Sequence, residues 1–128
     1  WQYYYHVPMH LDIEAMEKAV KHFEGTHDFA AFMAAGSPVK STVRTIYEAK
    51  MVREGDFIHF FFTGDGFLYN MVRIMAGTLI DVGKGKISPD SIPGIILSRD
   101  RTQAGPTAPP HGLTLEEVYY ENIPVRDA

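Results

Sequence analysis

Two neighbouring β-prone segments, TVRTIYEAKMVRE (42–54) and DFIHFFFTG (56–64), constrain the fold more than any other part of this sequence. The first segment alternates, and we expect one of its faces to consist of Val43, Thr45, Tyr47, Ala49 and Met51. Alternation with a period of two is typical of a strand with one buried face, and a short turn that contains glycine joins two such strands into a hairpin. The sequence therefore predicts a pair of long antiparallel strands joined through Glu54-Gly55.

Helical patterns lie on both sides of this hairpin. In residues 11–25, Asp12 stands where a helix cap is expected, apolar residues recur at helical spacing, and Gly25 follows. A second and more apolar helix is predicted for the stretch FLYNMVRIMAGTLIDVGKG (67–85). The other expected elements are a strand in 1–7, a helical turn starting near Thr26 or Asp28, a helix in 87–100, a stiff loop in 101–112 and a strand in 113–121.

Together these elements predict one α+β domain, residues 1–128, with an antiparallel sheet and helices packed on one face. The chain has no cysteine, so disulfides, thiolate metal sites and cysteine nucleophiles are excluded, and a reducing compartment is compatible. The formal net charge of −4 argues against broad binding of a phosphate backbone by this segment alone. The sequence begins without methionine in an aromatic run, and we expect a longer protein whose residues 1–5 form an uncovered strand edge here.

Arg73 interrupts the apolar helix and has two interpretations. On a helical wheel it falls opposite the main apolar arc, which is typical of a solvent-exposed position. Its neighbours on that side include Tyr69, Asn70 and Gly77, in place of the lysines and glutamates of an ordinary exposed face. A glycine inside a helix costs about 1 kcal/mol relative to alanine, which indicates that something packs closely against Gly77. A guanidinium on this strip is well placed to hold a carboxylate from elsewhere.

Other candidate sites have simpler interpretations. The six histidines show no convincing ligand spacing, so no metal site is predicted. Asp28 is expected to cap a turn and not to act as a catalytic acid. The phenylalanines of the second strand are either core or a base-stacking platform, and long apolar strands beside apolar helices favour core.

Three motifs in this order carry a family resemblance: GTHDF, GDGFLYNMVRIMAGTLIDVGKG and DRTQAGPTAPPHGL. They closely resemble the C-terminal half of the bacterial tRNA pseudouridine synthase A family. The resemblance implies an isomerase that converts uridine to pseudouridine in the anticodon stem–loop of tRNA, without metal or organic cofactor. It also implies a cytoplasmic homodimer with tRNA as its partner.

The resemblance assigns roles to two residues. Arg73 matches the arginine that pairs with the family's catalytic aspartate, and Leu113 matches an apolar residue that lines the uracil pocket. We assign Arg44 and Tyr69 to substrate binding as well. The structural alternative for Leu113 is the first core residue of a strand.

The catalytic aspartate itself is not found in this chain. In the family it lies in the N-terminal half, within an Arg-Thr-Asp-Ala-Gly motif, and the similar RTQAG at residues 101–105 has glutamine in its place. We therefore expect the N-terminal domain to be missing from this sequence and the chain to be inactive alone. The alternative function is a non-catalytic module for tRNA docking or dimerisation.

Overall fold

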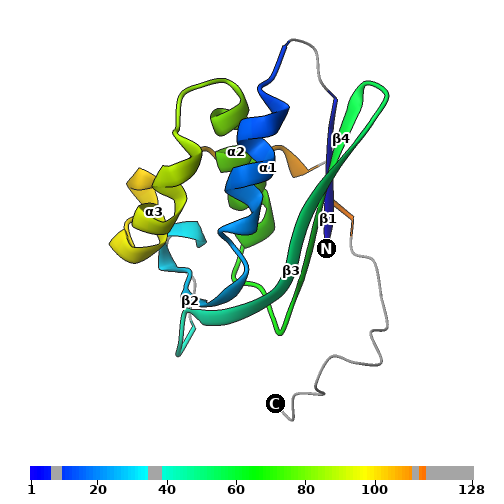
Figure 1. Cartoon of the computed structure of the whole chain (residues 1–128). Helices are drawn as coiled ribbons and strands as arrows, with labels where there is room; N and C mark the ends of the chain where they lie inside the picture. The colour runs from blue at the N-terminus through cyan, green and yellow to red at the C-terminus, as the bar shows by residue number, and fades with distance from the viewer. Residues whose placement is uncertain (7–9, 35–38, 111–112, 115–128) are drawn as a thin grey trace.

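The computed structural model describes residues 1–6, 10–34, 39–110 and 113–114. Five strands form one antiparallel sheet in the order β2-β3-β4-β1-β5. Helices α1, α2 and α3 lie on the same side of this sheet (Figure 1). The strands are β1 (Gln2–His6), β2 (Gly25–Asp28), β3 (Val43–Glu54), β4 (Phe57–Gly64) and β5 (Leu113–Thr114). The helices are α1 (Ile13–Lys21), α2 (Met71–Gly83) and α3 (Ile92–Ser98), with 3₁₀ turns η1 (Ala30–Phe32), η2 (Pro89–Ser91) and η3 (Arg101–Gln103).

The predicted α+β class is confirmed, and the main elements follow the order of a split βαβ fold, β1-α1-β3-β4-α2-β5. The short strand β2 adds an edge beside β3. β4 is the central strand, and it pairs with β1 along five residues of each strand.

The predicted hairpin is confirmed, and the predicted face of its first strand is right for Ala49 and Met51 but wrong before the bulge. Ile46 and Ala49 are both buried although they are three residues apart, whereas Val43 is 46% exposed. A β-bulge explains the difference, because β3 advances two residues from Ile46 to Glu48 while β4 advances only one. The extra residue, Tyr47, reverses which side chains face the helices.

The first strand is also not the uncovered edge that we expected. β1 lies between β4 and β5, and Gln2 and Tyr3 are paired on both sides. Tyr3 is 1% exposed and belongs to the core. The expectation of a frayed edge is therefore wrong for these two residues.

Side-chain hydrogen bonds stabilise the N-terminal ends of α1 and η1. The Asp12 side chain caps α1 as predicted, by accepting a hydrogen bond from the Ala15 N–H at 3.1 Å. The helical turn expected from Thr26 or Asp28 begins only at Ala30, because residues 25–28 pair with β3 as a strand. Asp28 does stabilise the turn, since its carboxylate accepts a hydrogen bond from the Ala30 N–H.

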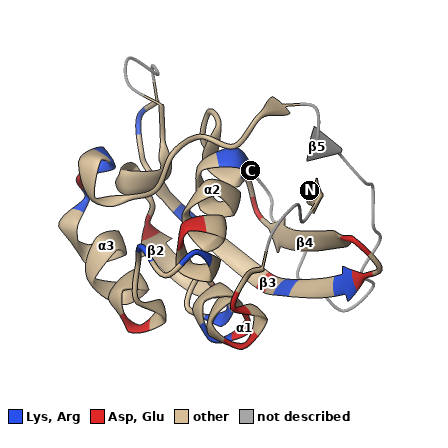
Figure 2. Cartoon of the chain, turned by 90° about the horizontal axis from the view of Figure 1, so that it is seen from above, with Lys and Arg blue, Asp and Glu red and all other residues tan. Residues whose placement is uncertain are grey.

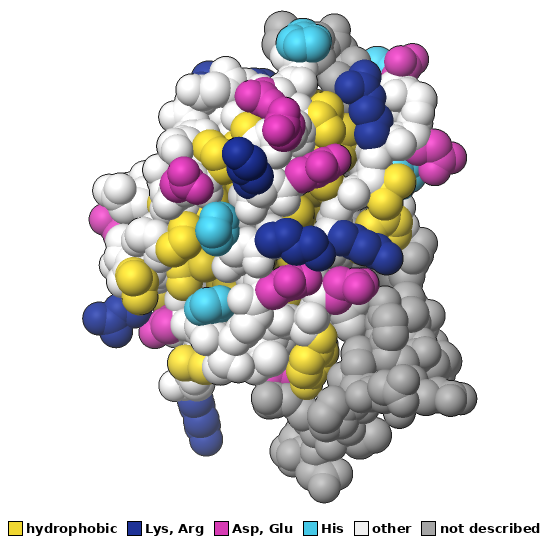
Figure 3. Space-filling view, in the orientation of Figure 1, with side chains coloured by type: hydrophobic (Ala, Val, Ile, Leu, Met, Phe, Trp, Pro, Cys, Tyr) yellow, Lys and Arg dark blue, Asp and Glu magenta, His cyan; other side chains and the backbone are white. Residues whose placement is uncertain are grey.

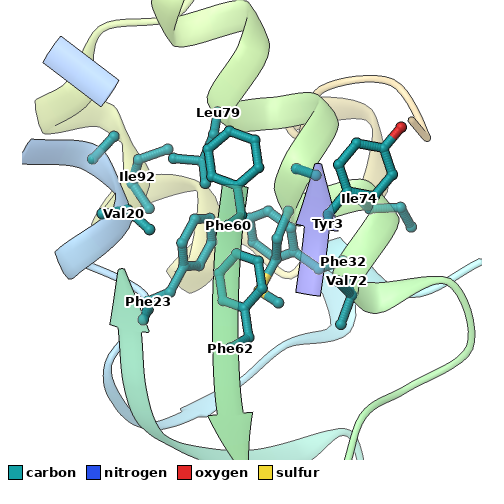
Figure 4. Packing of buried hydrophobic residues seen from close by; sticks show 14 of the residues in the cluster. Tyr3, Val20, Phe23, Phe32, Phe60, Phe62, Val72, Ile74, Leu79 and Ile92 are labelled. Atoms are coloured by element: carbon teal, nitrogen blue, oxygen red, sulfur yellow. The ribbon is translucent and has the colours of Figure 1, made fainter. Parts of the chain in front are cut away.

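The core lies between the sheet and the helices and is rich in aromatic rings (Figure 4). Phe60 and Phe62 belong to it, which confirms the core interpretation for these two rings. Phe57 is 39% exposed, and in the alternating β4 strand it lies on the face away from the helices. α2 is buried over most of its circumference, because helix, sheet and a loop all pack against it.

Candidate active site

The loop that follows α3 packs directly on the backbone of α2. A Cβ atom placed on Gly77 would lie 1.7 Å from the Pro106 carbonyl oxygen, and one on Gly105 would lie 2.6 Å from the Thr78 Cα. Only glycine allows so close an approach of two backbones. The Thr78 hydroxyl, which is fully buried, accepts a hydrogen bond from the Gly105 N–H at 2.9 Å. The close packing predicted at Gly77 is therefore confirmed.

Local hydrogen bonds hold this loop in shape. Asp100 caps η3 by accepting bonds from the Thr102 N–H and hydroxyl, and these bonds lower the pKa of the Asp100 carboxyl. Arg101 donates to the Gly105 carbonyl at 2.8 Å and to the Thr107 hydroxyl at 3.2 Å. Arg101 thus stabilises the conformation of the loop.

The same loop holds Arg73, which projects from the first turn of α2. The Arg73 Nε–H donates to the Ala108 carbonyl at 2.8 Å, and the Ala108 N–H donates to the Arg73 carbonyl at 3.0 Å. The Arg73 Nη1 donates to the Asn70 side-chain oxygen at 3.0 Å. The guanidinium is half-buried and carries its charge in a fixed orientation, with no carboxylate within 4 Å among the described residues.

Arg73 also lines a pocket of about 430 Å³. Most of its wall is the segment that leads into α2, and Trp1, directly before β1, also lines it. The lining residues are Trp1, Gly66, Phe67, Leu68, Tyr69, Asn70, Met71, Val72 and Arg73. The pocket therefore combines mostly apolar walls with one fixed cation, which suits a planar, partly polar ring.

Tyr3 supports the site from the sheet side. Its hydroxyl donates to the Pro109 carbonyl at 2.8 Å, next to the residue that holds Arg73. Burial raises the pKa of the Tyr3 hydroxyl, and the positive charge of Arg73 opposes that rise. Tyr3 is therefore a neutral hydrogen-bond donor at physiological pH.

A family model described as tRNA pseudouridine synthase matches residues 19–121. The chain belongs to this family. It is 56% identical over 116 residues to tRNA pseudouridine synthase A of Acetivibrio thermocellus. It is also 53% and 52% identical over 120 residues to the proteins of the same name from Geobacillus sp. and Bacillus subtilis.

These alignments cover nearly all of the chain but only part of each relative. They include 91% to 94% of the chain and 48% to 49% of the relatives. The chain thus spans about half the length of the curated relatives it matches.

The structure brings two of the four predicted site residues into one pocket. Arg73 and Tyr69 both line it, and Tyr69 is 67% exposed. Arg44 lies at its margin, because a Cβ atom on Gly66 would be 3.5 Å from the Arg44 Nε. Leu113 pairs with Tyr3 through the backbone, and its side chain lies outside the described residues.

Sequence reasoning missed three contributors to the site. Trp1 lines the pocket, Asn70 binds the guanidinium, and the Ala108 carbonyl binds the guanidinium from the loop. An asparagine just before a helix is a recognisable signal, since asparagine is common at such ends. That signal was lost because the helix was expected to begin at Phe67, four residues before its observed start.

Charges outside the pocket are mixed. Figure 2 shows acidic and basic residues together on α1 and near the end of β3. On the face seen in Figure 3 the two signs are interspersed and form no single basic patch. No group of three potential metal ligands occurs among the described residues. None of the described helices is long and apolar enough to cross a membrane.

Proposed function

We propose that this chain forms the C-terminal half of the active site of an enzyme that converts uridine to pseudouridine in the anticodon stem–loop of tRNA. One observation carries the proposal: Arg73 lines a mostly apolar pocket, two hydrogen bonds hold its guanidinium, and three of its five N–H groups are unpartnered among the described residues. We propose that an aspartate in an upstream N-terminal domain supplies the matching carboxylate.

Arg73 would act on that aspartate in two ways. A nearby guanidinium favours the ionised carboxylate and lowers its pKa, so that the carboxylate is ready to react at neutral pH. The paired geometry also fixes the direction in which the carboxylate faces the sugar and the base. The reaction breaks the N-glycosidic bond, turns the base and joins its C5 to the sugar, and the proton of C5 is released.

The pocket supplies the space for the base. Its volume of about 430 Å³ falls within the range of roughly 300–1,000 Å³ that is usual for ligand pockets. A uridine inside a helical stack cannot reach such a pocket, so the target nucleotide must leave the stack. We propose that Tyr69, at the open side of the pocket, contacts the base or its sugar, that Arg44 at the margin contacts the RNA backbone, and that Leu113 contacts the uracil.

We propose that tRNA is bound mainly by parts of the protein beyond this chain. The net charge of −4 and the mixed surface support this view, because phosphate contacts require clustered cations. Following the family resemblance, we further propose that the full-length protein is a cytoplasmic homodimer, which sedimentation of the purified protein would test.

Release of tritium from tRNA labelled at C5 of uridine tests the enzymatic function. The full-length protein is expected to release tritium, and residues 1–128 alone are expected to release none, since the chain lacks the motif aspartate. Failure of the full-length protein on tRNA would contradict the proposal. Activity of residues 1–128 alone would show that the nucleophile lies within this chain.

The alternative is a module that docks tRNA or a second copy of the protein without chemistry. One observation favours this alternative: Val52 on β3 and Phe57 on β4 are exposed, and exposed apolar groups often mark contact surfaces. Binding of tRNA by the full-length protein without any tritium release would support this alternative.

A further inference from the structure

Asn70 has an unusual backbone conformation directly before α2. Its φ of 60° lies in the left-handed region, which among the described non-glycine residues only Arg99 shares. Asparagine tolerates this region better than most residues because its short side chain can hydrogen-bond locally. A residue held in this way usually has a specific task.

The hydrogen bonds of the Asn70 side chain indicate this task. Asn70 stands at the N-cap of α2, yet its side chain makes no capping hydrogen bond to the first turn. Its Oδ1 instead accepts the hydrogen bond from Arg73 Nη1 at 3.0 Å. The left-handed backbone therefore turns the amide of Asn70 away from the usual capping role and toward the guanidinium.

Two bonds from opposite sides determine how the guanidinium is presented. The Ala108 carbonyl occupies Nε–H, so a carboxylate cannot use the edge formed by Nε and Nη2. The hydrogen bond from Nη1 to Asn70 is a second attachment point, so the guanidinium plane cannot rotate about its hydrogen bond to Ala108. The two Nη2–H groups and the second Nη1–H are left for an incoming acid.

We propose that Asn70 is a positioning residue, which orients the guanidinium of Arg73 so that its terminal N–H groups face the catalytic carboxylate. The assignment rests on the proposed function, because it requires a catalytic carboxylate that pairs with Arg73. A neutral amide suits this role. It accepts the hydrogen bond without cancelling the positive charge, whereas a carboxylate at the same place would compete with the catalytic acid.

Turnover of the full-length enzyme on tRNA tests the assignment with three variants. Asn70→Gly keeps the left-handed backbone but removes the acceptor, and we expect kcat to fall by about 10-fold, with the KM for tRNA within about twofold of wild type. Asn70→Asp is expected to lower kcat further, since its charge engages the guanidinium. Arg99→Gly, the matched backbone control at the other left-handed position, is expected to leave kcat unchanged. An unchanged kcat in Asn70→Gly, or a change in KM alone, would overturn the assignment.

A second readout is independent of catalysis. The Nη protons of Arg73 in the full-length protein are expected to give separate, slowly exchanging NMR signals, which merge in Asn70→Gly but persist in Arg99→Gly. If wild type forms no pseudouridine, the proposed function fails, and these signals still decide whether Asn70 orients the guanidinium. Separate signals that persist in Asn70→Gly would show that it does not.

Discussion

Substitution of Gly77 by alanine is the sharpest structural perturbation of the site. In an ordinary helix this change stabilises the protein by about 1 kcal/mol, because alanine is the better helix former. Here the new methyl group would lie 1.7 Å from the Pro106 carbonyl oxygen and 3.3 Å from the Ala108 nitrogen. Both contacts are to backbone, so the loop must move away from α2.

The cost follows from the bonds that such a movement breaks. The loop would lose the Ala108 N–H bond to the Arg73 carbonyl, worth about 1 kcal/mol, and the charged bond from Arg73 Nε, worth about 2 kcal/mol. The bond from the Gly105 N–H to Thr78 adds about 1 kcal/mol. After subtraction of the gain in helix propensity, the free energy of unfolding should fall by about 3 kcal/mol.

Urea unfolding of Gly77→Ala measures this loss, and Gly94→Ala is its matched control. Gly94 also lies in a helix, but a Cβ atom there would meet nothing within 4 Å. We expect Gly94→Ala to be neutral or to stabilise by up to about 1 kcal/mol. If Gly77→Ala were as stable as Gly94→Ala, the account of the loop and the helix would be refuted.

Two further predictions concern supporting residues. Tyr3→Phe should cost about 1 kcal/mol at neutral pH, because the Pro109 carbonyl loses its donor. The folded-state pKa of Tyr3 is raised above its ordinary 10.0, so neutral Tyr3 stabilises the fold below about pH 10 and this contribution is lost as pH rises toward the raised value. Urea unfolding between pH 9 and 11 should therefore show a shallower decline in Tyr3→Phe than in wild type, and equal slopes would contradict the shift. Asp28→Ala should cost about 1–2 kcal/mol by removing the acceptor for Ala30 and Thr42, while turnover on tRNA stays near wild type. A complete loss of turnover in a folded Asp28→Ala protein would instead make Asp28 a candidate acid.

The overall architecture could be predicted because its signals are local. Alternation in residues 43–54, the turn at Gly55 and the cap at Asp12 each act within a few residues. The bulge at Tyr47 could not be predicted in this way, because it depends on the pairing of β3 with β4. Strand register is set by the partner and the core, and a shift of one residue reverses the buried face.

The candidate site was predictable only in part, for the same reason. The unusual neighbours of Arg73 and the glycine at position 77 indicated a close contact, and both features are visible in one helix. The identity of that contact depends on Ala108, which is 35 residues away in the chain. The left-handed conformation of Asn70 was hidden because a continuous helix from Phe67 fitted the apolar pattern equally well.

Turnover of full-length Arg73→Lys on tRNA is the decisive measurement for the role proposed for Arg73. Lysine keeps the positive charge but cannot hold Ala108, Asn70 and a carboxylate at once in the planar geometry of arginine. The loss of a charge-assisted pair, roughly 2–4 kcal/mol, predicts that turnover falls by a factor of about 30 to 1,000 while the protein stays folded. The control Lys84→Ala, at the far end of α2, should leave turnover near wild type. Full turnover in Arg73→Lys would contradict the claim that this guanidinium holds the catalytic acid.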